Sequence, residues 1–353
     1  MDTRTRILRA VRGETVDRVP WSIYPAIIPT GEVEREMRNH GMAFNTIVTP
    51  YTRQMPDVEV IHRQAWERGQ EFTYTTYRTP VGEISEKRRV EEGYGSSWIV
   101  EFLIKRPQDY RVYEYVVRHT EIVPDYDTVL EAKESVGNDG VTLAWTTRSP
   151  YQQMYIELMG IERLALDRAD NVPGFLSLRG ALEEQHERIY RLVAQSPADL
   201  VWCPDNLSDL VAGGKVFDSY YVPYYDRMAE ILRQAGKTMV SHFDGRLGGI
   251  IEAIGRTGIP VIEAFTPPPM GNVSVPRAKA AWPEKVIWIN FPGSVFLEEP
   301  AEIKRFTIEL LRESMPGGRF LLGITENIPR TVYRRAMYAL ADGIAEFEGQ
   351  GWV

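Results

Sequence analysis

The chain has 353 residues, of which 43% are hydrophobic and 25% are charged, as in an ordinary globular protein with a sizeable core. Its formal net charge of −8 speaks against nucleic-acid binding, which needs clustered Lys and Arg. No apolar run approaches the roughly 20 residues of a membrane span, and the N-terminus lacks the apolar core of a signal peptide.

The single cysteine, Cys203, excludes an internal disulfide framework and a Cys-rich zinc site. Any metal would have to be bound mostly by His, Asp and Glu. One free cysteine also fits a reducing compartment. The sequence therefore predicts a cytoplasmic protein.

The first 60 residues predict short helices around one strand, with helices over 5–12 and 31–39. Residues 71–104 alternate between apolar and polar side chains around Thr79-Pro-Val-Gly82, which predicts a β-hairpin. From about residue 140, short apolar strands alternate with amphipathic helices.

The strands expected in this rhythm lie over residues 20–24, 72–76, 141–145, 199–203, 238–242, 261–264, 286–290 and 319–324. Eight strands alternating with helices predict a single (β/α)₈ TIM barrel with short N-terminal helices, and residues 71–104 would form a hairpin insertion. A doubly wound open sheet is the competing interpretation. No linker or repeat divides the chain, so residues 1–353 are expected to form one domain.

Polar side chains follow most of the later strands, where barrel enzymes place their chemistry. They are Asp205 and Asn206 after the fourth strand, His242 and Asp244 after the fifth, Glu263 in the sixth, Asn290 in the seventh and Glu326 after the eighth. Each residue alone is weak evidence, because loops are rich in Asp and Asn. Together they predict a polar centre at one mouth of the barrel.

His242, Asp244 and Glu263 are the predicted catalytic residues. Asp244 lies two positions after His242, so both side chains can face the same side of an extended segment. His242 could instead be a core histidine, and Asp244 could cap a helix over 246–256. Glu263 within an apolar strand needs a charged partner, a hydrogen bond or a metal.

His242, Asp244, Glu263 and Glu326 could together bind a divalent metal ion. Zinc accepts sets of His and carboxylate ligands, and manganese or iron would accept them too. For Glu326 the alternative is a place beside a helix N-terminus, where its charge is favourable.

The predicted substrate-binding residues are Tyr24, Trp145, Arg148, Asp205, Asn206 and Asn290. The two aromatic side chains would wall an apolar pocket, and Arg148 would bind a carboxylate. The chain has no phosphate-binding Walker loop, no dinucleotide fingerprint and no Gly-x-Ser-x-Gly elbow.

Several segments carry a resemblance. "RILRAVRGETVDRVPW", "SPYQQMYIELMGIERL", "YYVPYYDRMAEILRQAGKTMVSHFDG" and "GGRFLLGITENIP" resemble the uroporphyrinogen decarboxylase superfamily over nearly the whole chain. The resemblance implies a single TIM barrel and is compatible with a homodimer. True uroporphyrinogen decarboxylases carry paired arginines after the first strand, and this chain has none there.

The chain is more similar to the corrinoid-dependent methyltransferase branch, whose members place His-x-Cys-Gly at the fifth strand and a later cysteine before a Gly-Ile-Pro-like turn. His242 matches that histidine, whereas Asp244 and Glu326 stand where the cysteines would be. The resemblance implies zinc, and two carboxylates in place of thiolates suit a harder site and a different substrate.

Three functions follow as hypotheses. The first is a methyltransferase that demethylates a small methyl ether or amine at a His/carboxylate zinc site. Its corrinoid would arrive on a separate protein, because the chain lacks the Asp-x-His-x-x-Gly motif. The second is a metal-free decarboxylase, with His242 or Asp244 as proton donor and Arg148 or Arg246 binding a small carboxylic acid. The third is a barrel that binds without catalysis.

Overall fold

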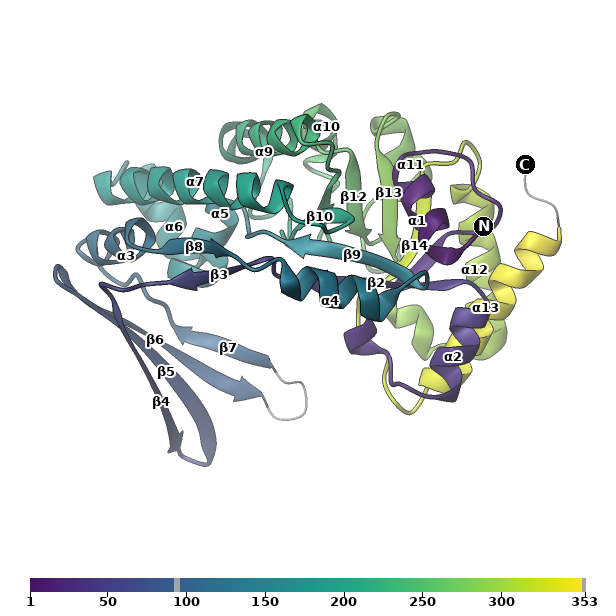
Figure 1. The fold of residues 1–353 in the computed structure, drawn as a ribbon, viewed down its shortest axis with the longest axis horizontal. Helices are drawn as coiled ribbons and strands as arrows, with labels where there is room; N and C mark the ends of the chain where they lie inside the picture. The colour runs from purple at the N-terminus through teal and green to yellow at the C-terminus, as the bar shows by residue number, and fades with distance from the viewer. Residues whose placement is uncertain (92–95, 351–353) are drawn as a thin grey trace. The chain divides into compact units, whose positions relative to one another are not determined.

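The computed structural model describes residues 1–91 and 96–350 (Figure 1). The chain forms two compact units. The first comprises Met1–Pro50, Asp125–Thr146 and Val193–Val353, and the second comprises Tyr51–Pro124 and Thr147–Leu192. The predicted domain, 1–353, with its insertion over 71–104, includes residues 92–95 and 351–353, which lie outside the described residues, and it stays a prediction.

The first unit is a closed barrel of eight parallel strands, ordered β1-β14-β13-β12-β11-β10-β9-β2. Their bounds are β1 Trp21–Ile23, β2 Met42–Val48, β9 Gly140–Trp145, β10 Leu200–Cys203, β11 Met239–His242, β12 Val261–Phe265, β13 Val286–Asn290 and β14 Phe320–Ile324. This confirms the predicted TIM barrel, because β1 pairs with both β2 and β14 and leaves no sheet edge open.

The second barrel strand was predicted wrongly. It is β2, at residues 42–48, whereas residues 72–76 lie in an antiparallel sheet of the other unit. Asn45 and Thr46 interrupt the apolar run of β2, so the sequence pattern does not indicate a buried strand there. Asn45 is buried nonetheless, because its amide donates to the Ser22 hydroxyl at 2.9 Å. The alternation at 72–76 is typical of antiparallel strands rather than of buried parallel ones.

Helices cover the barrel on the outside and close its amino-terminal end. They are α1 Thr3–Val11, α2 Glu32–Asn39, α4 Asp127–Val136, α8 Gly214–Val216, α9 Val222–Gln234, α10 Ile251–Arg256, α11 Val275–Ala281, α12 Pro300–Ser314 and α13 Tyr333–Gly349, with short turns η1 Pro25–Ile27, η3 Phe217–Tyr221 and η4 Gly293–Leu297. Ile7, Ala10 and Val11 of α1 pack in one buried cluster with the inward-facing Trp202 and Trp288. The barrel interior is therefore a packed core, as is usual for this fold.

The second unit contains two antiparallel sheets and several helices. Its elements are β3 Tyr51–Gln54, β4 Glu59–Glu67, β5 Gln70–Thr79, β6 Gly82–Glu91, β7 Ser96–Glu101, α3 Asp109–Arg118, β8 Glu121–Pro124, α5 Pro150–Gln153, η2 Met154–Met159, α6 Gly160–Ala169 and α7 Pro173–Ala194, whose last two residues belong to the first unit.

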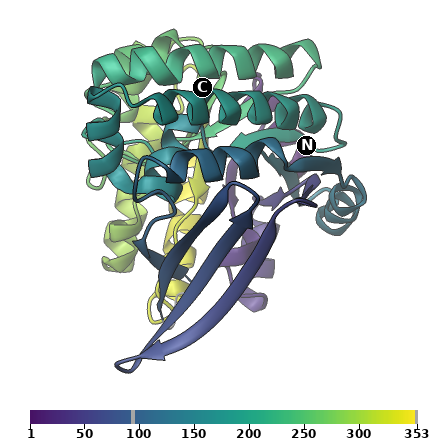
Figure 2. The same cartoon turned by 90° about the vertical axis from the view of Figure 1, so that its left-hand side faces the viewer.

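Strand β3 pairs with β8, and β4 to β7 form a four-stranded antiparallel sheet, whose long strands stand out in Figure 2. Thr79 pairs with Gly82, which confirms the predicted hairpin. Helix α3 packs against β5 and β6, with Tyr113 edge-on to Tyr77. Within the two described ranges, no helix has the length and apolar character needed to cross a bilayer.

Asp199, just before β10, ties three elements of the barrel together. Its carboxylate accepts hydrogen bonds from Lys133 of α4 at 3.0 Å, from the Thr142 backbone of β9 at 3.0 Å, and from Arg4 of α1. Burial alone would raise the pKa of Asp199, but these donors together lower it below 3.8. The stability that the carboxylate contributes is therefore present above about pH 4 and is lost as pH falls through the lowered pKa.

We expect Asp199→Ala to lower the free energy of unfolding by roughly 1–3 kcal/mol at pH 7, because the Thr142 donors lose a buried acceptor while the cations reach solvent. Urea unfolding measures the loss. Asp218→Ala is the control, since Asp218 is exposed and forms one ion pair with Arg256, and it should change little. Equal stability of both variants would contradict the role of Asp199.

Candidate active site

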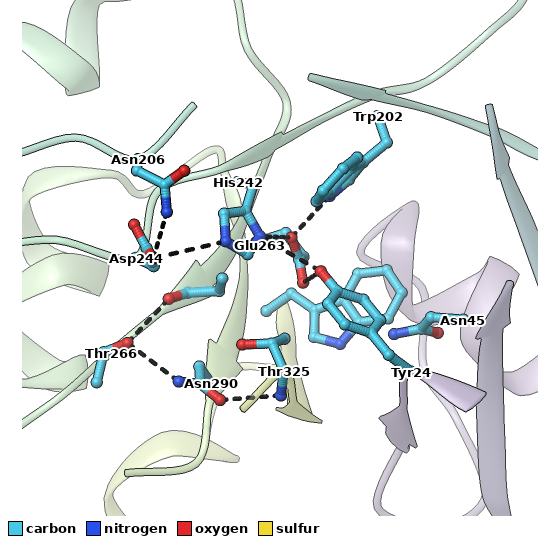
Figure 3. A network of polar contacts seen from close by, with 12 residues as sticks. Tyr24, Asn45, Trp202, Asn206, His242, Asp244, Glu263, Thr266, Asn290 and Thr325 are labelled. Carbon is cyan, nitrogen blue, oxygen red and sulfur yellow. Dashed lines mark hydrogen bonds and ion pairs between the residues drawn. The ribbon is translucent and has the colours of Figure 1, made fainter. Parts of the chain in front are cut away.

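A network of polar side chains lies at the carboxyl ends of the barrel strands (Figure 3). Its centre is Glu263 of β12 and His242 of β11, which stand side by side because the two residues are register partners. Tyr24, just after β1, and Trp202 of β10 both donate hydrogen bonds to the Glu263 carboxylate. The predicted polar centre is thus present, and it is assembled from strands far apart in the sequence.

Glu263 is completely buried, and both of its oxygens are hydrogen-bonded. Oε1 accepts from the Tyr24 hydroxyl at 2.7 Å, and Oε2 accepts from Trp202 Nε1 at 2.9 Å. Oε2 also lies 2.8 Å from His242 Nδ1. The charge of Glu263 and its hydrogen bond favour positive charge on the histidine.

The backbone is distorted directly after this carboxylate. Ala264 has a φ of +54°, in the left-handed region that a residue with a Cβ seldom adopts, and the register with β13 shifts between Ile262 and Phe265. Such a conformation costs on the order of 1–3 kcal/mol and is found mostly at functional sites. Here it follows the glutamate that holds His242.

His242 lies between two carboxylates. Its Nδ1 donates to Glu263, and its Nε2 lies 3.7 Å from Asp244 Oδ2, within ion-pair distance but beyond a hydrogen bond. Burial alone would lower the pKa of His242, but the charges of Glu263 and Asp244 outweigh it and raise the pKa from 6.5 to about 9. The two carboxylates therefore favour the protonated imidazole, whose Nε2 is directed away from Glu263.

Asp244 is held from the neighbouring loop. Its Oδ2 accepts from the Asn206 amide at 2.6 Å, so Asn206 positions Asp244 beside His242. Asp244 does not cap a helix, because α10 begins at Ile251 and the residues before it form turns. The alternative of a helix cap is therefore wrong.

Two further predicted residues come from β13 and from the loop after β14. Asn290 is fully buried, and its side chain bridges Thr266 and the Thr325 backbone, with N–O distances of 3.4 and 3.0 Å (Figure 3). Glu326 is half-buried, and burial together with the charge of Asp244 raises its pKa above 4.5. Glu326 is thus electrostatically coupled to the His242 site.

The remaining predicted substrate residues have different surroundings. Asp205 is completely buried and accepts from the Tyr225 hydroxyl at 2.6 Å. Trp145 packs against Trp202, with ring centroids 5.0 Å apart. Arg148 belongs to the second unit and pairs there with Glu157 at 3.1 Å. Their roles in binding substrate stay predictions.

Gly245 allows the loops after β10 and β11 to touch. A Cβ at this position would lie 1.5 Å from the Leu207 carbonyl oxygen, far inside van der Waals contact. The same two loops are joined by the Asp209 backbone N–H, which donates to Arg246 O at 2.7 Å. The close approach is what sets Asn206 against Asp244.

We expect Gly245→Ala to separate these loops and to lower the free energy of unfolding by roughly 1–3 kcal/mol, the usual cost of overpacking. Thermal unfolding measures it. Gly214→Ala is the control, since a Cβ there meets nothing within 4 Å. If both variants unfold at the same temperature, the close approach of the two loops is not present in solution.

The four predicted metal ligands do not fit a zinc site in the arrangement observed. Within residues 1–91 and 96–350, no three His, Cys, Asp or Glu side chains are grouped as metal ligands. Both oxygens of Glu263 are occupied by hydrogen-bond donors, so this residue orients His242 instead. Zinc binding stays a prediction for metal analysis.

Four members of these networks were not predicted from the sequence: Trp202, Thr266, Thr325 and Tyr225. A signal for Trp202 was present, because a buried indole N–H needs an acceptor and a buried carboxylate such as Glu263 needs donors. Nothing comparable singled out Thr266 and Thr325.

No protein-family model matches the chain, and no curated protein matches its sequence. Among solved structures, a methyltransferase from Methanosarcina mazei is similar with a TM-score of 0.59 and 13% sequence identity, covering 99% of each chain. The tandem GH20 catalytic modules of the pneumococcal exo-beta-D-N-acetylglucosaminidase StrH reach a TM-score of 0.40 at 10% identity, over 97% of this chain and 87% of that one. The second likeness is too slight to bear on function, and the first shows a shared fold.

Proposed function

We propose that this chain is a methyltransferase-like enzyme that removes a methyl group from a small methyl ether or amine and passes it to a corrinoid carried by a separate protein. The observation that supports this most is the position of His242 at the barrel mouth, hydrogen-bonded to Glu263 and next to Asp244. The fold shared with a methyltransferase agrees with the proposal, although fold alone does not imply function.

A methyl ether is hard to demethylate because its leaving group is an alkoxide. A corrinoid on the partner protein would supply the electron pair for the new bond to the methyl carbon. The electrons of the broken C–O bond remain on oxygen, and His242 Nε2 gives that oxygen its proton, so that an alcohol leaves. A positioned proton donor contributes about 10²–10⁴-fold to such a step. For an amine, the same proton goes to nitrogen before the bond breaks.

The neighbours of His242 have separate tasks in this reaction. Glu263 holds Nδ1 and thereby fixes which way Nε2 points, while Tyr24 and Trp202 hold Glu263 in turn. Asp244 lies too far from Nε2 for a hydrogen bond, at 3.7 Å, so it favours the charged imidazole without taking up its proton. The proton therefore stays available to a substrate at the mouth.

Methyl transfer to free cob(I)alamin tests the proposal. The purified chain is incubated with a methoxylated aromatic or a methylamine, and methylcobalamin formation is followed by absorbance. We expect formation that depends on the chain and on His242. Metal analysis of the same sample shows whether zinc is present, and loss of about one zinc per chain in His242→Ala would favour metal-assisted transfer over proton donation.

A decarboxylase is the second candidate, because the same charged His242 could protonate the carbanion left when carbon dioxide departs from a small acid. Arg246, an exposed arginine two residues after Asp244, would bind the carboxylate of such a substrate. Release of carbon dioxide from small carboxylic acids, with no methylcobalamin formed, would decide for the decarboxylase.

A further inference from the structure

We propose that the amino-terminal end of the barrel, opposite the His242 mouth, binds a small organic anion with an apolar body. A cavity of about 430 Å³ opens there between the end of α1, the end of α9 and the starts of β11 to β14. Its volume is within the range of cavities that hold small ligands. The proposal is independent of the reaction at the mouth.

The inner wall of this cavity is apolar. It includes Val11 of α1, Met239 of β11 and Val286 of β13, whose exposed fractions are 3%, 1% and 2%. Ala229 of α9 completes the wall. An apolar group seated here would pack against these core side chains, and the energy gained grows with the apolar area covered.

The rim of the cavity is rich in cations. Arg12, Arg233, Lys237 and Arg319 line it, against three carboxylates. Lys237 donates to two backbone carbonyl oxygens, of Ser196 and Ala198, at 2.8 and 2.7 Å. In the part of the chain that the structure describes, no carboxylate oxygen lies within ion-pair distance of Lys237. Lys237 therefore has no direct ion pair in these residues, and its ammonium favours an anion.

The three carboxylates of the rim all have partners within the rim. Asp226 accepts from the Gly258 backbone at 2.7 Å, and Glu230 is paired with Arg233 at 2.7 Å. Glu284 approaches Arg319 only to 3.5 Å and is 88% exposed. An incoming anion could thus reach the Arg319 guanidinium by displacing a weak, solvated pair.

Arg319 itself is held in an unusual conformation. Its φ is +53°, in the left-handed region, where a residue other than glycine is strained. This backbone lays the guanidinium over Gly13, where an added Cβ would lie 3.1 Å from Nη1. The strained arginine therefore joins the end of α1 to the start of β14 at the edge of the cavity. A glycine would adopt this conformation without strain. The contacts of the Arg319 side chain therefore offset the cost of the strained backbone.

The probe 8-anilinonaphthalene-1-sulfonate has the required chemistry, an aromatic body and one sulfonate, and its fluorescence rises in apolar surroundings. We expect saturable binding of one probe per chain. Ala229→Phe should abolish it by placing a phenyl ring inside the cavity, and Arg12→Gln should weaken it about fivefold to tenfold. Circular dichroism confirms that each variant is folded.

Arg9→Gln is the matched control for Arg12→Gln. Both arginines lie on the same turn of the chain and pair with Glu14, but only Arg12 lines the cavity. His242→Gln should bind the probe as the natural chain does, which separates this site from the mouth. If Arg12→Gln binds as tightly as Arg9→Gln, or if probe binding survives Ala229→Phe, the proposal is wrong.

Competition then tests the class of ligand. Benzoate should displace the probe at lower concentration than inorganic phosphate, because it offers an apolar body as well as a charge. Equal displacement by phosphate would overturn the requirement for an apolar body, and no displacement by either would overturn an anion site.

Discussion

Replacing His242 with glutamine is expected to lower the rate of methyl transfer by about 10²–10⁴-fold. Glutamine keeps a side chain of similar polarity but has no titratable proton to give to the leaving oxygen. The substrate can still enter the mouth, so the loss should be in kcat more than in KM. Formation of methylcobalamin at substrate saturation measures it.

His62→Gln is the control for this variant, because His62 is exposed on β4, where its Nδ1 lies 3.4 Å from the Thr75 hydroxyl. It should leave the rate unchanged. If His242→Gln keeps its rate within about twofold, the proton comes from another group. Glu326 is then the first candidate, because burial raises its pKa.

Replacing Glu263 with glutamine is expected to move the pH dependence of the reaction. In the natural chain, activity should fall as pH rises through about 9, where His242 loses its proton. Without the Glu263 charge, the pKa of His242 falls, because burial is then opposed by Asp244 without the second carboxylate. The protonated fraction drops about tenfold for each pH unit above the new pKa, so activity at pH 8 should fall by about tenfold or more. A pH–rate profile and an NMR titration of the imidazole measure the change.

Tyr24→Phe is the matched comparison for Glu263→Gln. It removes one hydrogen bond to the carboxylate at 2.7 Å but keeps the charge, so it should move the profile less. Stability gives an independent readout. The pKa of His242 is higher in the folded chain than in the unfolded one, so its contribution is full below about pH 6.5 and is lost as pH rises through about 9. If Glu263→Gln keeps both dependences, the Glu263 charge does not control His242.

The sequence predicted the barrel well because parallel strands covered on both faces appear as short apolar runs between helices. It failed at Met42–Val48 because Asn45 is polar yet buried. That burial depends on one hydrogen bond to Ser22 of the adjacent strand. A pattern along the chain does not contain such a contact between strands.

The positions of polar residues at the strand ends predicted which side chains would lie at the same mouth of the barrel. They did not predict which hydrogen bonds those side chains would form. Tyr24 and Glu263 are 239 residues apart, and Trp202 and Glu263 are 61 apart, so local spacing says nothing about either hydrogen bond. From the sequence, Glu263 and Asp244 were both predicted to bind a metal ion through their carboxylate oxygens. The structure separates them, because Glu263 is enclosed by donors whereas Asp244 is 30% exposed at the mouth.

The closure of the barrel by β1 and β14 also has a consequence for biogenesis. Strand β1 forms one of its two ladders with residues 322–324, so that ladder forms only when the ribosome has made nearly the whole chain. At about 5–20 residues per second, β1 waits roughly 15–60 seconds for its partner. During that time apolar side chains of α1 and β1 stay exposed to water. The nascent chain is therefore most prone to aggregation, or to capture by a chaperone, before β14 is synthesised.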